Sequence, residues 1–127
     1  MRLLLDTHIW LWSLREPERL GRRLIRELDD PGNELWLSPV STWEALALYA
    51  KRRIEISGDL TDWLALATRN LREAPLTHEI AIASQQFPLP HPVDRLLAAT
   101  ALVLDLTLVT ADAQLLGLRE IKTMANR

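Results

Sequence analysis

The sequence predicts an α/β protein whose parallel sheet carries helices on both faces. Short apolar runs typical of buried strands alternate along the chain with longer segments of helical periodicity. Strands separated by helices in a small chain pair in parallel, because each helical crossover returns the chain to the same end of the sheet. The 127 residues, 48% hydrophobic and 25% charged, suit one domain over residues 1–127 with an ordinary buried core.

The first half of the chain predicts strands at residues 3–5 and 35–38. The first is the apolar run Leu-Leu-Leu, and the second is Leu-Trp-Leu-Ser, which follows the turn sequence Asp-Pro-Gly-Asn. Helical patterns complete this half: an apolar helix with Trp10 and Trp12 that breaks near Pro17, a basic amphipathic helix to about Asp29, and helices at 41–53 and 59–72.

The second half predicts one long apolar helix followed by a well-marked strand. Pro92 opens the helix, which runs to about Leu104, and the β-branched run at 107–110 is typical of a strand. Shorter elements surround these two: an edge strand at 75–77, a helix at 78–86, a helical turn at 113–116 and a weak last strand at 120–122.

Composition excludes several classes of protein. The chain has no cysteine, which excludes a disulfide framework, a thiolate zinc site and a cysteine nucleophile. Charged residues interrupt the first apolar segment before a signal peptide or a membrane span is complete, so we expect a cytoplasmic protein with no membrane partner. The sequence also lacks the glycine-rich nucleotide motifs and the serine-hydrolase motif.

The net charge of −2 lacks the strong positive balance of many nucleic-acid-binding proteins, so such a role needs a local basic patch. One candidate is the arginine stripe of the second helix, and the other is the run at residues 51–53. The stripe consists of Arg19, Arg22, Arg23 and Arg26. Either patch could contact a polyanion or form an ordinary solvated helix face.

Two aspartates follow predicted strands directly. Asp6 comes after the first strand, and Asp112 comes after the strand at 107–110. Parallel strands end at one edge of the sheet, where such sheets bind ligands, so both carboxylates are predicted at that edge. A single aspartate in this position is often only a turn former or a helix cap.

Two further acids lie near the starts of helices. Glu44 has mainly apolar neighbours one helical turn away, which is unusual for a carboxylate, but Ser41 to Glu44 also matches a capping box. Cap and metal ligand are therefore equally supported for Glu44. Asp94 lies in the first turn of the helix that starts at Pro92, where capping alone would explain it, although this helix leads into the strand that precedes Asp112.

Four carboxylates at one edge would repel one another without a cation. Oxygen ligands favour Mg²⁺ or Mn²⁺, which share their coordination shell with phosphate oxygens and activate water, so the set predicts phosphodiester hydrolysis. His8, His78 and His91 show no ligand spacing, and we expect local hydrogen bonds for each. Trp36 and Trp43 are predicted to lie in the core, whereas Trp10 and Trp12 cannot both face inward.

Four segments together resemble the PIN-domain family, and more closely its VapC-type toxins from toxin–antitoxin modules. They are LLLDTHIWLW, LSPVSTWEALALYAKRRIEI, HPVDRLLAATAL and LTLVTADAQL. Their order and spacing are specific and cover nearly the whole chain. The resemblance implies a three-layer α/β/α sandwich with a short parallel sheet, acting as a ribonuclease with an acidic Mg²⁺ or Mn²⁺ site.

The resemblance also implies roles for individual residues. The four acids of the family correspond to Asp6, Glu44, Asp94 and Asp112, and the supporting residues to Thr7, Thr110 and Arg95. An RNA substrate, a cognate antitoxin and a homodimer are the implied partners, with the antitoxin expected on the early helices where Ile9, Trp10 and Leu11 adjoin the arginine stripe. Two positions depart from the family pattern: Asp105 replaces a glycine before a strand, and Leu115 replaces an aromatic residue.

Alternative functional interpretations of the sequence fit less well. A phosphoacceptor receiver domain needs an acidic pair after the first strand, but Thr7 and His8 follow Asp6. An aspartyl phosphatase would need a second aspartate where His8 stands. The serious alternative is a non-catalytic PIN module that binds RNA or a protein partner through the same surface.

Overall fold

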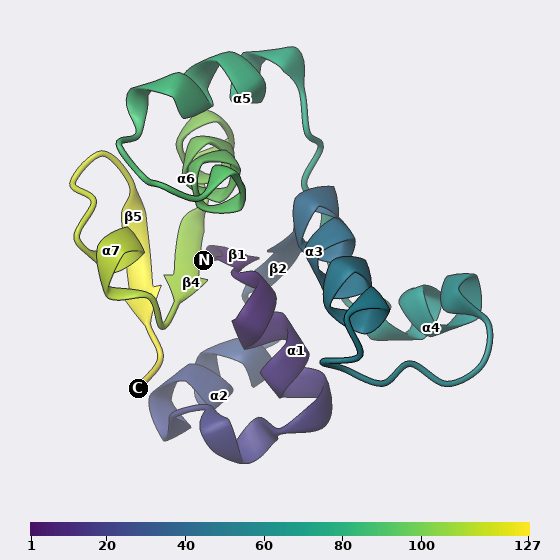
Figure 1. Cartoon of the computed structure of the whole chain (residues 1–127). Helices are drawn as coiled ribbons and strands as arrows, with labels where there is room; N and C mark the ends of the chain where they lie inside the picture. The colour runs from purple at the N-terminus through teal and green to yellow at the C-terminus, as the bar shows by residue number, and fades with distance from the viewer.

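A five-stranded parallel sheet forms the middle layer of the computed structural model, which describes residues 1–127 (Figure 1). Its strands are β1 (Arg2–Leu5), β2 (Glu34–Leu37), β3 (Arg72–Glu73), β4 (Thr107–Thr110) and β5 (Lys122–Ala125). The order across the sheet is β3-β2-β1-β4-β5, and every neighbouring pair is parallel. The predicted α/β fold with a short parallel sheet is confirmed.

Seven helices connect the strands. They are α1 (Thr7–Arg15), α2 (Arg22–Asp29), α3 (Pro39–Ala50), α4 (Leu60–Ala67), α5 (His78–Ala83), α6 (Pro92–Leu104) and α7 (Ala113–Leu116). Two 3₁₀ turns, Pro17–Arg19 and Ser84–Gln86, follow α1 and α5. None of these helices is both long and apolar enough to cross a membrane.

The central strand divides the core into two clusters because successive strand side chains point to opposite faces. Leu4 packs with Leu97 of α6 and other residues on one face. Leu3 and Leu5 pack on the other face with a cluster that includes Trp10 of α1. All of these side chains are buried, so the sheet lies between two helical layers.

Several element boundaries differ from the sequence prediction, among them one each in α3, α4, β3 and β5. Helix α3 begins at Pro39 and not at residue 41, α4 ends at Ala67 and not at 72, β3 lies at Arg72–Glu73 and not at 75–77, and β5 lies at Lys122–Ala125 and not at 120–122. Pairing explains the strand shifts: Arg72 aligns with Trp36 of β2, and all four residues of β5 align with β4. Proline at residue 75 has no amide hydrogen to extend the ladder.

The two departures from the family pattern have local consequences. Asp105, at the end of α6, has a φ of 52°, in the left-handed region where glycine is favoured. Its Oδ1 atom accepts a hydrogen bond of 3.0 Å from Nζ of Lys122, which helps to fix this turn. Leu115 is fully buried, so an aliphatic side chain fills that position in the core.

Gly21 is expected to tolerate no side chain. A Cβ added there would lie 1.7 Å from the carbonyl carbon of Arg127. Hydrogen bonds fix this contact, because Asn126 Oδ1 accepts from the Gly21 amide at 2.8 Å and the Arg127 carbonyl accepts from the Leu24 amide at 2.8 Å. We expect Gly21→Ala to lower the free energy of unfolding by about 1 to 3 kcal/mol, as overpacking does, measured by urea denaturation.

Gly32→Ala is the matched control for this substitution. Its added Cβ would meet only the side chain of Asp30, at 3.2 Å, and that side chain can move. Equal losses of stability in the two variants would show that the contact between Gly21 and Arg127 is not the cause.

Candidate metal centre

The centre of the candidate site is the edge of the sheet where β1 and β4 end side by side. Leu5 aligns with Val109 in the parallel ladder, and the Asp6 amide donates a 2.9 Å hydrogen bond to the Val109 carbonyl. Asp6 therefore follows the end of β1 at the level where β4 also ends, two residues before Asp112. The structure brings the two strand-end carboxylates together from positions far apart in the sequence.

Asp6 is held in a buried and well-defined orientation. Its side chain is 8% exposed, and it caps α1 by accepting a 2.7 Å hydrogen bond from the Thr7 amide on Oδ1. Oδ2 accepts a 2.7 Å hydrogen bond from the hydroxyl of Thr110. Burial raises the pKa of Asp6 above its ordinary value, while these two hydrogen bonds act in the opposite direction.

Thr110→Val is expected to disturb both strand-end acids. The Thr110 hydroxyl donates to Asp6 and accepts a 3.0 Å hydrogen bond from the Asp112 amide, and the residue is fully buried. Each buried group left without a partner costs about 1 to 3 kcal/mol, so thermal denaturation should show a clear loss of stability. Thr110→Ser keeps the hydroxyl and should lose much less; equal losses would contradict the role of the hydrogen bonds.

Glu44 lies in the second turn of α3, facing the cavity. The N-cap of this helix is Ser38, whose Oγ accepts from the Val40 amide at 3.1 Å. The capping-box interpretation of Ser41 and Glu44 is therefore wrong. Proline at position 39 suits the first helical position, so the helix starts two residues closer to the N-terminus than predicted. Ser41 is buried inside the helix and accepts a 2.9 Å hydrogen bond from the Thr7 hydroxyl, which ties α3 to α1.

Asp94 lies in the first turn of α6 and is half-buried. Burial is the main cause that raises its pKa to about 6, and the nearby charges of Asp6 and Asp112 add to the effect. His91 acts in the opposite direction. The pKa of Asp94 therefore reflects first its burial and second the nearby carboxylates.

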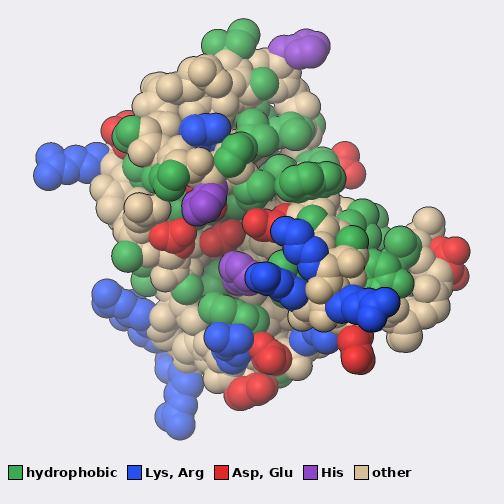
Figure 2. All heavy atoms as spheres, in the orientation of Figure 1, with side chains coloured by type: hydrophobic (Ala, Val, Ile, Leu, Met, Phe, Trp, Pro, Cys, Tyr) green, Lys and Arg blue, Asp and Glu red, His purple; other side chains and the backbone are tan.

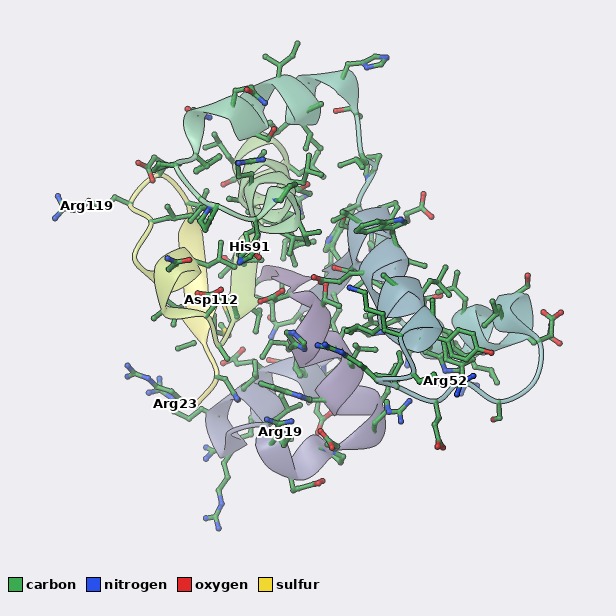
Figure 3. All side chains as sticks on the ribbon, viewed as in Figure 1. Arg19, Arg23, Arg52, His91, Asp112 and Arg119 are labelled. Carbon is green, nitrogen blue, oxygen red and sulfur yellow. The ribbon has the colours of Figure 1, made fainter.

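The four acids line one cavity of about 610 Å³. His8, His91, Trp12 and Trp43 also line it. Figure 2 shows acidic side chains gathered across the middle of this face, with hydrophobic side chains above and Lys and Arg side chains below, and Figure 3 labels His91 and Asp112. The structure contains four ion pairs, and none includes any of the four acids.

The chemistry of the oxygen atoms fits a hard divalent cation. Glu44 and Asp94 accept no hydrogen bond, and Asp112 uses only Oδ1, which accepts from the Gln114 amide at 2.8 Å. Carboxylate oxygens without partners are the ligands that Mg²⁺ and Mn²⁺ take in proteins. In their present rotamers no three acidic or histidine side chains converge as a ready ligand set, so binding would require side-chain rotation.

Arg95 holds the loop that precedes α6. One guanidinium nitrogen donates a 2.9 Å hydrogen bond to the Leu89 carbonyl, and the side chain is half-buried. Arg95 is not among the residues that line the cavity. Its contacts therefore support the position of α6, and with it the position of Asp94.

The histidines depart from the prediction of local hydrogen bonds. The structure contains no hydrogen bond from the side chain of His8, His78 or His91. His8 and His91 line the acidic cavity, whereas His78 is exposed on α5. The nearness of His8 to Asp6 and of His91 to Asp94 in the sequence was the signal for their place at the site.

The tryptophans line the site more than the sequence suggested. Trp43 was predicted in the core but is 63% exposed and lines the cavity. The buried face of α3 carries Ser41 and Ala45, and Trp43 is two residues from each, so it lies on the opposite side of the helix. Trp10 is buried and Trp12 is half-buried, which confirms that they do not both face inward. Ile9, Trp10 and Leu11 are all buried, so the expectation that they form a docking surface is wrong.

The fold and the cavity define a class: a parallel α/β sandwich with carboxylates gathered where its central strands end. The PIN domain model matches residues 3–121, and the chain therefore belongs to the PIN-domain family. The resemblance inferred from the four sequence segments is confirmed.

Individual relatives agree with this assignment. The chain is 29% identical over 116 residues to ribonuclease VapC22 of Mycobacterium tuberculosis, covering 89% of this chain and 88% of the relative. Its fold is similar to VapBC2 of Rickettsia felis bound to promoter DNA, with a TM-score of 0.76, 14% identity and 98% of each chain covered. It is also similar to FitAcB of Neisseria gonorrhoeae, with a TM-score of 0.70, 21% identity and 96% of each chain covered.

Proposed function

We propose that this chain is a metal-dependent endoribonuclease that acts as the toxin of a toxin–antitoxin pair. The observation that carries the proposal is the cavity lined by Asp6, Glu44, Asp94 and Asp112, none of which has a cationic partner in the protein. A relative that is a ribonuclease, and similar structures that belong to VapBC complexes, support the same function. The proposal treats residues 1–127 as one PIN-like domain.

Each acid has a proposed part in holding one or two Mg²⁺ or Mn²⁺ ions. Glu44, Asp94 and Asp112 offer oxygens without hydrogen bonds, and Asp6 is the fourth proposed ligand, held in place by its two hydrogen bonds. A cation held by these acids would supply Lewis acidity, which would polarise a phosphodiester and lower the pKa of a bound water. The Thr7 amide and the Thr110 hydroxyl keep Asp6 oriented, and Arg95 supports the start of α6.

The proposed partners follow from the proposed function. RNA is the proposed substrate, the proposed location is the cytoplasm, and a cognate antitoxin keeps the protein inactive. One route to inhibition is a basic antitoxin side chain that enters the acidic cavity and pairs with its unpaired carboxylates. A homodimer is the proposed assembly, as the resemblance to VapC-type toxins implies.

The experiment that tests the function is cleavage of an RNA pool by purified protein free of antitoxin. We expect discrete cuts with Mn²⁺ or Mg²⁺, and none with EDTA. Sequencing of the cut ends would identify the target RNA. A protein that binds RNA but leaves it intact with both metals would favour the alternative, a non-catalytic PIN module that binds RNA or a protein partner.

A further inference from the structure

A second cavity, of about 340 Å³, adjoins the acidic one. The two share His8 and Trp12, which line both, so they form a continuous surface. We call the second cavity the arginine groove, because Arg15, Arg19 and Arg53 line it. All three arginines are exposed.

The arginine groove is positively charged and partly preorganised. Its lining contains three arginines and one acid, Glu16, which gives it a net charge of +2 with neutral histidine. One nitrogen of Arg15 donates to the Glu55 carbonyl, and Arg19 pairs with Glu16 at 3.1 Å. Arg53 forms no ion pair and is therefore available to an anion.

Aromatic rings mark the border between the two cavities. The guanidinium carbon of Arg19 lies 4.4 Å from the ring centroid of Trp12, and the His8 and Trp12 ring centroids are 5.9 Å apart. Trp43 lines the acidic cavity and leaves 63% of its surface exposed. An exposed indole beside a catalytic cavity is a surface on which an unpaired base can stack.

We propose that single-stranded RNA runs from the arginine groove across Trp12 into the acidic cavity, with one unpaired base stacked on Trp43. The inference rests on the proposed function, since it deepens the recognition of the same substrate. Arg53 and Arg19 contact backbone phosphates on one side of the cut, and Trp43 selects an unstacked base beside it. Trp43 thus makes the site specific for unpaired RNA.

Charge favours RNA over an acidic protein segment as the occupant. A phosphodiester backbone carries a negative phosphate at every nucleotide. One phosphate can therefore contact the arginines of the groove while another contacts a cation bound in the acidic cavity. Only a nucleic acid also supplies flat bases for the exposed indole. An acidic peptide would match the arginines alone.

The test measures binding of fluorescein-labelled oligouridine by fluorescence anisotropy, in an Asp94→Asn background with Mg²⁺ so that the RNA stays intact. Trp43→Ala should weaken binding roughly tenfold, the usual loss when a stacked aromatic side chain is removed. Trp43→Phe should restore most of the affinity. Because Trp43 is exposed, these variants should fold normally.

Tyr49→Ala is the matched control, because Tyr49 is an exposed aromatic residue on α3 that lines neither cavity. It should leave the affinity unchanged. An abasic oligomer of the same length should bind the Asp94→Asn parent protein and its Trp43→Ala variant equally, since it has no base to stack. A loss of affinity for the abasic oligomer equal to that for oligouridine would overturn the stacking.

Arg53→Gln tests the path of the backbone. The slope of log affinity against log salt should fall in magnitude by about 0.7, the value for one phosphate contact with a single strand. Arg52→Gln removes the same charge from the residue immediately before Arg53. Arg52 lies just after the end of α3 and does not line the arginine groove, so this variant should change the slope much less (Figure 3). Equal slopes in the two variants would overturn the path.

Failure of this inference is distinguishable from failure of the proposed function. If Trp43→Ala binds oligouridine as the wild type does while wild-type protein still cleaves RNA, the nuclease stands and the RNA path is wrong. In that case the exposed indole belongs to a protein-contacting surface. If the wild type neither binds nor cleaves RNA, both proposals are overturned.

Discussion

Asp6→Asn is expected to lower the rate of RNA cleavage by a factor on the order of a hundred or more. Several kcal/mol of transition-state stabilisation come from a catalytic cation, and removing the most buried charge of its site weakens that contribution. Asparagine is as good an N-cap as aspartate, so α1 should still form and the protein should fold. The loss should therefore be one of activity at retained structure.

Two measurements separate this outcome from unfolding. Mn²⁺ should raise the melting temperature of the wild type by binding the native state, and the rise should be small in Asp6→Asn. Glu120→Gln, which neutralises an exposed loop acid outside the cavity, should retain both cleavage and the Mn²⁺ response. Full activity in Asp6→Asn would remove Asp6 from the proposed site.

The elements that could be predicted from the sequence carry strong local signals. Helix α6 starts at Pro92 and β4 consists of Thr107–Thr110, as expected, because proline fixes a helix start and β-branched residues favour a strand. The convergence of Asp6 and Asp112 followed from topology alone, since parallel neighbours end at one edge.

The parts that could not be predicted depend on tertiary pairing or on one choice between similar signals. Ser38 and Ser41 are both competent caps, so the local sequence did not decide where α3 starts. The exposure of Trp43 depends on which face of α3 packs against the rest of the protein. The short strand β3 has no strong propensity of its own and exists because it pairs with β2. The hydrogen bond from Thr110 to Asp6 required the three-dimensional approach of β1 and β4.

The stability of the metal-free protein is expected to fall as pH rises from about 4 to about 6. The pKa of Asp94 is about 6 in the folded protein against 3.8 as its ordinary value, so the folded state binds the proton more tightly. Stability is therefore highest below the unfolded pKa and reaches its lower plateau above the folded one. Because Asp94 is only half-buried, solvent screening reduces the effect to about 1 to 2 kcal/mol.

Urea denaturation in EDTA at pH 5 and pH 7.5 measures this effect in wild type and Asp94→Asn. The variant has no titrating group at this position, so its stability relative to wild type should increase with pH, and a difference independent of pH would contradict the assignment. A cation and a proton compete for the same carboxylate, so the rise in melting temperature caused by Mn²⁺ should be large at pH 7.5 and small at pH 5. Burial of the Asp94 carboxylate, with repulsion from Asp6 and Asp112, therefore destabilises the metal-free protein at neutral pH, and a bound cation would offset this cost.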